Sequence, residues 1–163
     1  MSGKNMIWVV VLVIIVAVGS STVYYVDERE KAIVFQFGEI VRSKDTPGLH
    51  FKAPLINNVR YFDSRVQTMD SDPELYLTRE KKNLVVDSFV KWRITNASDY
   101  YTRLGGLASN ARNRLAQRVN DALRREFGNR SVQQVISGDR VEIMDVVRQT
   151  TNEEIASLGI EVL

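Results

Sequence analysis

The sequence predicts an α+β protein, with a single N-terminal transmembrane helix followed by a domain in which helices pack against a twisted, antiparallel-rich sheet. Three observations lead to this class. Residues 6–26 contain no charged side chain. The three prolines, at positions 47, 54 and 73, all lie in the first half of the remaining chain, where strands and turns are therefore expected. The second half has no proline, and its apolar residues recur at helical spacing.

Residues 6–26 are long enough to cross a bilayer as one helix. At 1.5 Å per residue, a helix of this length reaches about 31 Å, which matches the hydrocarbon core. Aromatic residues near both ends suit the boundary with the lipid headgroups. The expected ends of this anchor are marked by Met6, Trp8, Tyr24, Tyr25 and Val26.

A cleaved signal peptide is the alternative interpretation of the same stretch. Lys4 supplies a short positive region, and residues 17–19 fit the small-x-small rule for cleavage before Ser20. For a retained anchor, the positive-inside rule keeps residues 1–5 in the cytoplasm. The same rule places the domain of residues 27–163 on the other side of the membrane.

Composition excludes several classes of function. Of the 22 basic residues, only Lys4 precedes residue 27. All 20 acidic residues lie at position 27 or later, so the domain of residues 27–163 is close to neutral. Such a balance argues against a nucleic-acid partner. The chain has no cysteine, which excludes disulfides, thiolate metal sites and cysteine nucleophiles.

Strands and turns are expected in the first half of the domain. Gly38 supplies a turn after the first strand, and residues 46–48 supply another. A charged turn at residues 79–83 joins two segments that should pair as a hairpin. The second segment alternates, with Val90 and Trp92 on one face and Lys91 on the other, as in a half-buried strand. The predicted extended segments are residues 31–37, 40–41, 49–52, 59–69, 75–78 and 84–94.

Helices are expected in the second half. Asn96 or Ser98 caps a short helix that ends at the glycine pair 105–106. A long amphipathic helix follows over residues 107–127 and is closed by Gly128. The capping box of Ser131 and Gln134 begins a further turn. The last helix begins near Ser137 and carries an apolar stripe of Val141, Met144, Val147, Ile155 and Leu158. A strand is expected over residues 160–163, and because the sequence stops as this strand starts, we expect it to be a piece of a longer chain.

The sequence predicts no catalytic, cofactor-binding or metal-binding residue. His50 is the only histidine and is expected to be structural, because no nucleophile motif lies near it. Residues 70–81 begin like a calcium loop, but Leu75 stands where glycine is needed and Lys81 where glutamate is needed. We therefore expect the acidic run at residues 70–74 to be a solvated loop. A Ser/Lys dyad stays open as an enzyme alternative.

The arginines of the long helix favour a solvated face over a nucleic-acid surface, because no aromatic residues are interleaved with them. They are also available for ion pairs between subunits. The members of this group are Arg112, Arg114, Arg118, Arg124 and Arg125.

The apolar loop at Pro54, Leu55 and Ile56 is a candidate membrane-contact site. A domain tethered to an anchor is held near the bilayer, where exposed apolar side chains enter the interface. Packing into the core is the alternative for these residues.

Long ordered blocks of the domain resemble the SPFH (band 7, stomatin/prohibitin) family. The stretch 77–94 is similar to one branch of that family and separates the chain from stomatin-like relatives. The other blocks that carry the resemblance are residues 26–34, 37–39, 47–56, 63–70, 123–128 and 158–160.

The resemblance implies a bacterial inner-membrane protein with a cytoplasmic N-terminus and a periplasmic main domain. It implies an HflK-like homologue as partner, association with the AAA protease FtsH, and control of the access of membrane substrates to that protease. It also implies contact with membrane lipid and side-by-side assembly into a large hetero-oligomeric ring or cage. A stomatin-like organiser of membrane microdomains, or a channel regulator, is the alternative.

Overall fold

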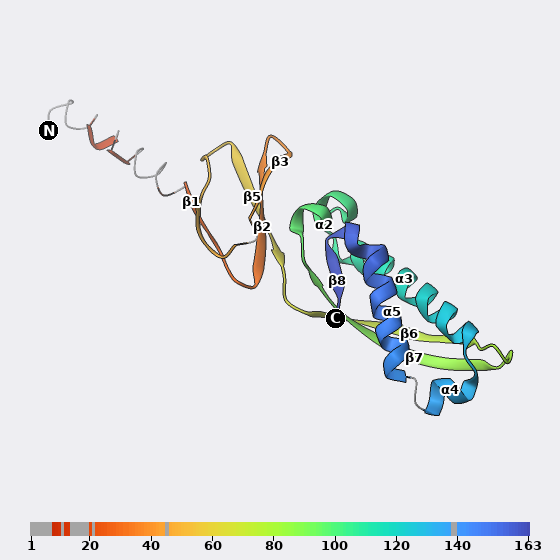
Figure 1. Cartoon of the computed structure of the whole chain (residues 1–163). Helices are drawn as coiled ribbons and strands as arrows, with labels where there is room; N and C mark the ends of the chain where they lie inside the picture. Colours follow the sequence, from red (N-terminus) through yellow and green to blue (C-terminus); the bar gives the residue numbers. More distant parts are fainter. Residues whose placement is uncertain (1–7, 11, 14–19, 21, 45, 138–139) are drawn as a thin grey trace. The chain divides into compact units, whose positions relative to one another are not determined.

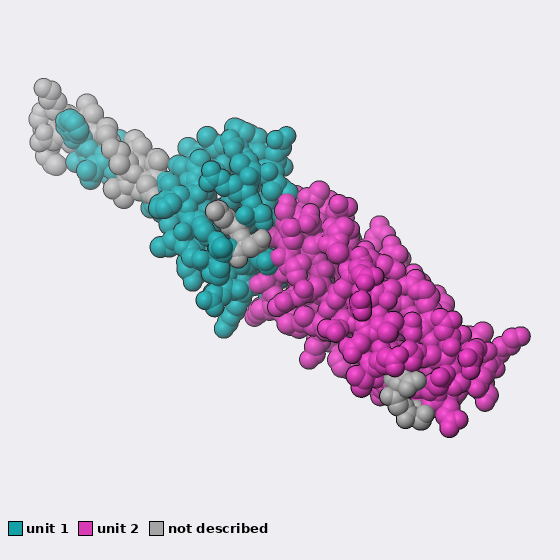
Figure 2. All heavy atoms as spheres, in the orientation of Figure 1, with its two compact units in different colours: residues 1–63 teal, residues 64–163 magenta. Residues whose placement is uncertain are grey.

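The computed structural model describes residues 8–10, 12–13, 20, 22–44, 46–137 and 140–163. The chain divides into two compact units, Met1–Asp63 and Ser64–Leu163 (Figure 2). We call them unit 1 and unit 2.

Unit 1 is built from two small antiparallel sheets (Figure 1). One sheet pairs β1 with β4, and the other has the order β3-β2-β5. The sheets meet through a cluster of Tyr24, Val26, Ala32 and Val34, against which Val59 packs. The strands are β1 (Val23–Val26), β2 (Glu30–Gln36), β3 (Glu39–Lys44), β4 (Gly48–Phe51) and β5 (Asn57–Asp63).

Strand β1 differs from the expectation that a helix runs to Val26. Tyr24 and Val26 point into the core, whereas Val23 and Tyr25 are exposed. The reason is local, since four β-branched or aromatic residues in a row favour a strand and β4 offers a partner. The expectation that the helix includes Tyr24, Tyr25 and Val26 is therefore wrong in this structure.

Most of the remaining predicted anchor, including its expected first residue Met6, lies outside the described residues. Its described positions 8–10, 12–13 and 20 are helical. Over the described part of the chain we find no helix that combines the length and the apolar character needed to cross a membrane. The anchor stays a prediction.

Unit 2 packs helices onto an antiparallel sheet of order β6-β7-β8. The predicted α+β class is confirmed, since antiparallel sheets occur in both units and helices accompany the sheet of unit 2. The strands are β6 (Gln67–Leu77), β7 (Asn83–Ile94) and β8 (Ile160–Val162). The helices are α2 (Ala97–Leu104), α3 (Ala108–Asn129), α4 (Val132–Ser137) and α5 (Arg140–Ile155), followed by the 3-10 turn η1 (Ala156–Leu158).

The predicted hairpin is present as β6 and β7. Met69 lies opposite Val90, and both are buried beneath the helices together with Trp92. Outward-facing positions alternate with these, as a sheet covered on one face requires. The helices contribute Leu115, Leu123, Ile143 and others to the same core.

The helix ends follow the predicted capping chemistry. Of the two candidate caps for α2, Asn96 is the one used, because its side chain accepts from the amides of Ser98 at 2.9 Å and Asp99 at 3.2 Å. Ser131 and Gln134 form a reciprocal capping box, with distances of 2.9 and 3.3 Å. Helix α3 continues through Gly128 by one residue.

The apolar stripe expected on the last helix is partly wrong. Val141 is 75% exposed and Met144 42% exposed, whereas Val147 and Ile155 are buried as expected. The face that packs includes Ile143 and Thr151, so its members are spaced by four residues. The sequence pattern did not indicate this face, because one of its buried positions, Thr151, is polar.

Candidate functional site

Unit 1 carries an apolar surface on the outer face of β1 and β4. The strand register sets Val23 opposite Phe51 and Tyr25 opposite Leu49. All four side chains are exposed. Since sheet faces turned to water normally carry polar side chains, this face is unusual for a solvated surface.

Two loops meet at the end of unit 1 where the chain enters β1. Gln36 at the end of β2 pairs with Asn57 at the start of β5, so the turn at Phe37 lies beside the loop of residues 53–56. Leu55 is 100% exposed and Phe37 is 85% exposed. The loop also follows Phe51 directly. We call the exposed residues of this face and these loops the apolar end; they are Val23, Tyr25, Phe37, Leu49, Phe51, Leu55 and Ile56.

The backbone at both loop tips is unusual for large side chains. Leu55 has φ of 70° and Phe37 has φ of 51°, in the left-handed region that favours glycine. A hydrogen bond of 3.1 Å from the Asn57 amide to the Ala53 carbonyl closes the loop around Leu55. Unit 1 therefore holds apolar side chains outward at a cost in backbone energy, and such strain is concentrated at functional sites.

Two of the three predicted loop residues are exposed in unit 1. Leu55 and Ile56 are exposed, and Pro54 is half-buried. Trp8 is 74% exposed. Phe37 was not predicted, because only the β2–β5 register shows that its turn lies beside the loop.

His50 has structural contacts in unit 1. A ring nitrogen lies 2.8 Å from the Thr46 carbonyl oxygen, and the ring packs on Tyr24 with 5.6 Å between centroids.

The expected solvated loop at residues 70–74 is wrong, because this run belongs to β6 and contains a bulge. Glu74 accepts from the Asn120 amide at 2.8 Å and lies 3.7 Å from Arg124. Tyr76 donates to the Asn120 side-chain oxygen at 3.2 Å. Burial raises the pKa of Tyr76, the Glu74 carboxylate raises it further, and Arg124 lowers it.

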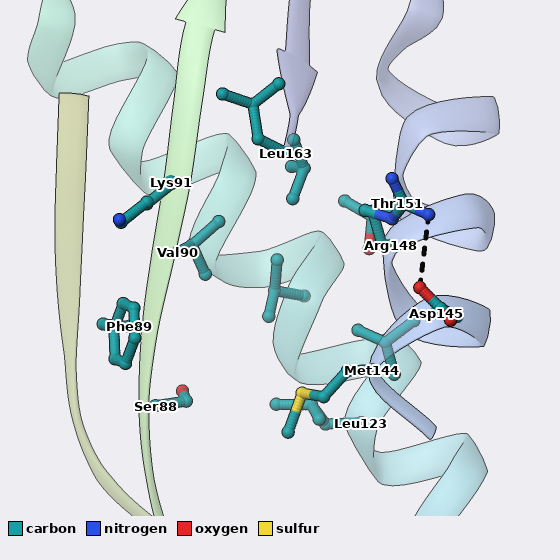
Figure 3. A pocket seen from close by; sticks show the side chains of 13 residues that line it. Ser88, Phe89, Val90, Lys91, Leu123, Met144, Asp145, Arg148, Thr151 and Leu163 are labelled. Atoms are coloured by element: carbon teal, nitrogen blue, oxygen red, sulfur yellow. Dashed lines mark hydrogen bonds and ion pairs between the residues drawn. The ribbon is translucent and has the colours of Figure 1, made fainter. Parts of the chain in front are cut away.

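A groove of about 420 Å³ runs along unit 2 between β7 and α5 (Figure 3). Its walls are mainly apolar, with Val90, Leu123 and Met144 among the residues that line it. Polar groups at its rim include Asp145 and Arg148, which form an ion pair of 3.2 Å. Strand β8 pairs with β7 only over Trp92–Ile94, so the groove lies beside an unpaired part of the β7 edge.

The groove does not assemble the Ser/Lys dyad left open by the sequence. Ser88 and Lys91 both line it, but they are three residues apart on a strand and so leave on opposite faces. Figure 3 shows the two side chains well apart along the strand. Among the described residues, no group of acidic or histidine side chains is arranged to hold a metal ion.

Several arginines of α3 are bound within unit 2. Arg118 and Arg125 both reach Glu154, at 3.3 and 2.9 Å. Arg124 reaches Glu74 and Asp121. Arg112 and Arg114 form no ion pair within the described residues.

The described elements of unit 1 are strands that carry an exposed apolar end, and unit 2 is an α+β unit with helices packed on its antiparallel sheet. The profile of the SPFH domain / Band 7 family matches residues 24–163. The chain belongs to the SPFH/band 7 family.

Curated relatives identify the branch of the family. Protein HflC of Haemophilus influenzae is 38% identical over 94% of this chain and 55% of the relative. The modulator of FtsH protease HflC of Escherichia coli K12 is 37% identical over 98% of this chain and 49% of the relative. Protein HflC of Vibrio cholerae is 38% identical over 79% of this chain. The chain thus spans about half the length of these relatives, and its similarity to HflC confirms the branch that residues 77–94 predicted.

Proposed function

We propose that this protein is a membrane-anchored, HflC-like scaffold that regulates the access of membrane substrates to an FtsH-type protease. The observation that carries the proposal is the 37% identity to a named modulator of FtsH protease over 98% of the chain. The role is regulatory and requires no covalent chemistry.

The proposed arrangement follows the sequence-based expectations. A helix within residues 6–26 anchors the protein in a bacterial inner membrane, with residues 1–5 in the cytoplasm and the main domain in the periplasm. An HflK-like homologue joins it in a ring or cage around FtsH. The family match and the positive-inside rule support this arrangement.

The apolar end is proposed to rest in the outer leaflet of that membrane. Leu55 and Phe37 are held outward despite an unfavourable backbone, and Phe51 and Leu49 extend the apolar surface beside them. All of these side chains would lose contact with water by entering the lipid interface, which is favourable in proportion to their apolar area.

Gentle detergent extraction of the native, full-length protein tests the proposed function. Sizing and mass spectrometry are expected to find a very large particle that contains an HflK-like homologue and FtsH. A particle that lacks FtsH but contains a channel protein would contradict the proposal and favour the stomatin-like alternative. A small species with neither would also contradict it.

A further inference from the structure

The hairpin of β6 and β7 ends in a turn that carries basic side chains (Figure 1). Arg79, Lys81 and Lys82 are all exposed. Lys82 lies 3.5 Å from Glu80, whereas Arg79 and Lys81 form no ion pair among the described residues. We call residues 79–82 the hairpin tip. Its three basic side chains outnumber its one acidic side chain, so it presents positive charge to the solvent.

Hydrogen bonds around Thr78 fix the backbone of the hairpin tip. The Thr78 hydroxyl, in a residue that is 3% exposed, donates to the Lys82 carbonyl at 3.1 Å and accepts from the Lys82 amide at 3.3 Å. The Lys81 amide donates to the Thr78 carbonyl at 2.9 Å, and the Arg79 amide donates to the Arg130 carbonyl at 3.1 Å. The last bond ties the tip to the end of α3. The basic side chains therefore start from an ordered backbone, which lowers the conformational cost of binding a partner.

Lys81 stands at a position of the tip that favours glycine. Its φ is 60°, in the left-handed region. Three-residue hairpin loops commonly end in such a residue, and glycine adopts the conformation without strain. A lysine here costs backbone energy, and strain of this kind is concentrated at functional sites. What the lysine adds is an ammonium group at the tip.

Apolar side chains flank the hairpin tip on the outer face of the sheet, turned away from the helices. Leu75 lies opposite Val85, and Leu77 follows on the same side. Leu75 is 64% exposed, Val85 71% and Leu77 52%. A partner that reaches the cations of the tip can cover this apolar surface as well, and the burial excludes water from the charge pairs.

The charge beyond the apolar residues favours a protein segment over a lipid surface. Asp87 follows Val85 on the same face of β7, and Asp70 lies on this face farther along β6. An anionic bilayer that covered the face would meet these carboxylates as well as the tip. A narrow segment can contact the tip and the apolar residues and end before the aspartates.

We propose that the hairpin tip binds an acidic segment of another protein. Its carboxylates would contact Arg79, which can form two parallel hydrogen bonds, and Lys81, which acts as a point charge. Its apolar side chains would cover Leu75, Leu77 and Val85. Recognition of acidic motifs by basic side chains is a recurring mode of peptide binding. The inference goes beyond the proposed function, because the charge of the segment is recognised whichever protein carries it.

Charge reversal at the tip of the full chain, in a mild detergent, tests this site. The probe is a short fluorescein-labelled peptide rich in glutamate with a few leucines, and its binding is measured by fluorescence anisotropy. One variant carries Arg79→Glu and Lys81→Glu. The matched control carries Arg112→Glu and Arg114→Glu on α3, which change the net charge of the protein equally. Circular dichroism verifies that both variants fold.

The tip variant is expected to bind the peptide about tenfold more weakly, because like charges then face one another. The control variant should bind within about twofold of the wild type, and the wild-type affinity should fall as salt is added. Unchanged affinity of the folded tip variant would overturn the proposal. So would an equal loss in the control variant, or equally tight binding of a peptide with lysine in place of glutamate.

Lys81→Gly separates binding from a role in the fold. Glycine relieves the left-handed strain, so this variant should be at least as stable as the wild type. It should bind the peptide about threefold more weakly, because it lacks the ammonium group. Full affinity in this variant would contradict the assigned role of Lys81 and overturn the proposal.

Lipid vesicles that contain phosphatidylglycerol test the alternative ligand. The tip variant and the wild type are expected to sediment with the vesicles to the same extent. Vesicle binding that is lost in the tip variant, together with unchanged peptide binding, would overturn the proposal and assign the hairpin tip to a membrane surface. None of these measurements depends on recovery of FtsH, so the tip and the proposed function can fail separately.

Discussion

The two units deal with their apolar side chains in opposite ways. Unit 1 buries a small cluster around Val26 and Val34 between two thin sheets and leaves the apolar end outside. Unit 2 covers its sheet with helices, so that Trp92 and Leu115 are fully buried. Around that core, ion pairs such as Arg125 with Glu154 occupy the surface.

Both units expose apolar side chains, but among the described residues only unit 1 holds such side chains, Phe37 and Leu55, at positive φ. Unit 2 buries a larger core beneath its helices, although Phe89, Ile136 and Val141 are among its exposed apolar side chains. In unit 1, Leu55 and Phe37 adopt unfavourable left-handed backbone conformations, and their side chains are exposed and do not pack into the core.

Truncation of Trp92 should have the largest effect and should be confined to unit 2. Trp92 has no exposed surface, so Trp92→Ala leaves a large cavity and is expected to lower the free energy of unfolding by about 3–5 kcal/mol. Hydrogen exchange resolved along the chain should show faster exchange in β6, β7 and α3. Strands of unit 1 that lose their protection to the same extent would break the distinction between the units.

Gly159 should be the next most sensitive position. Its φ is 71°, and an added Cβ would collide with the Asn96 carbonyl oxygen and the Tyr100 amide. We therefore expect Gly159→Ala to destabilise the protein by about 2–4 kcal/mol, as the sum of backbone strain and overpacking. Denaturant unfolding measures the change.

Gly128 is the matched control, because it lies inside α3 with open space around its Cβ position. Gly128→Ala should stabilise the protein by about 0.5–1 kcal/mol. Equal effects of the two substitutions would contradict the assigned backbone conformations.

The buried phenol of Tyr76 should link stability to high pH. Its pKa is raised in the folded state, so its contribution is fully present below the unfolded value near 10 and is lost as the pH rises through the folded value. Tyr76→Phe removes the bond to Asn120, at a cost of about 1 kcal/mol at neutral pH, and should lose less stability than the wild type above pH 10. Unfolding curves between pH 7 and 11 provide the measurement, and parallel losses in both proteins would argue against this role.

Replacement of Leu55 should have the smallest effect on stability. Asparagine tolerates the left-handed backbone, and Leu55 buries no surface within unit 1, so Leu55→Asn should change the free energy of unfolding by at most about 0.5 kcal/mol. Thermal unfolding in a mild detergent measures it. A loss above 1 kcal/mol would show that Leu55 supports the fold of unit 1.

Local patterns predicted much of the fold. The alternation of Val90, Lys91 and Trp92 predicted the faces of β7, and Asn96, Ser131 and Gln134 predicted helix starts. These features depend on neighbours in the sequence, so the sequence alone shows them.

Features that depend on distant partners were missed. Val23–Val26 became a strand because β4 pairs with it, and that pairing spans about twenty-five residues of sequence. Thr151 takes a core position on α5 that hydropathy assigns to Val141 or Met144. Phe37 joins Leu55 only through the pairing of β2 with β5, and the groove beside β7 is lined by four separate elements, β7, α3, α5 and β8.

The depth of Leu55 in a bilayer tests the central distinction between the units most directly. The chain has no cysteine, so Leu55→Cys and Ile136→Cys each provide a single site for a nitroxide spin label. Ile136 is a matched control, since it is 73% exposed but lies in unit 2. The full chain is reconstituted in lipid vesicles, and collisions of the label with oxygen and with a water-soluble nickel complex are measured.

We predict that the label at position 55 meets oxygen often and the nickel complex rarely, as expected inside the lipid interface, whereas the label at position 136 shows the reverse. Equal access of the nickel complex to both labels would contradict the account, because the apolar end of unit 1 would then be facing water.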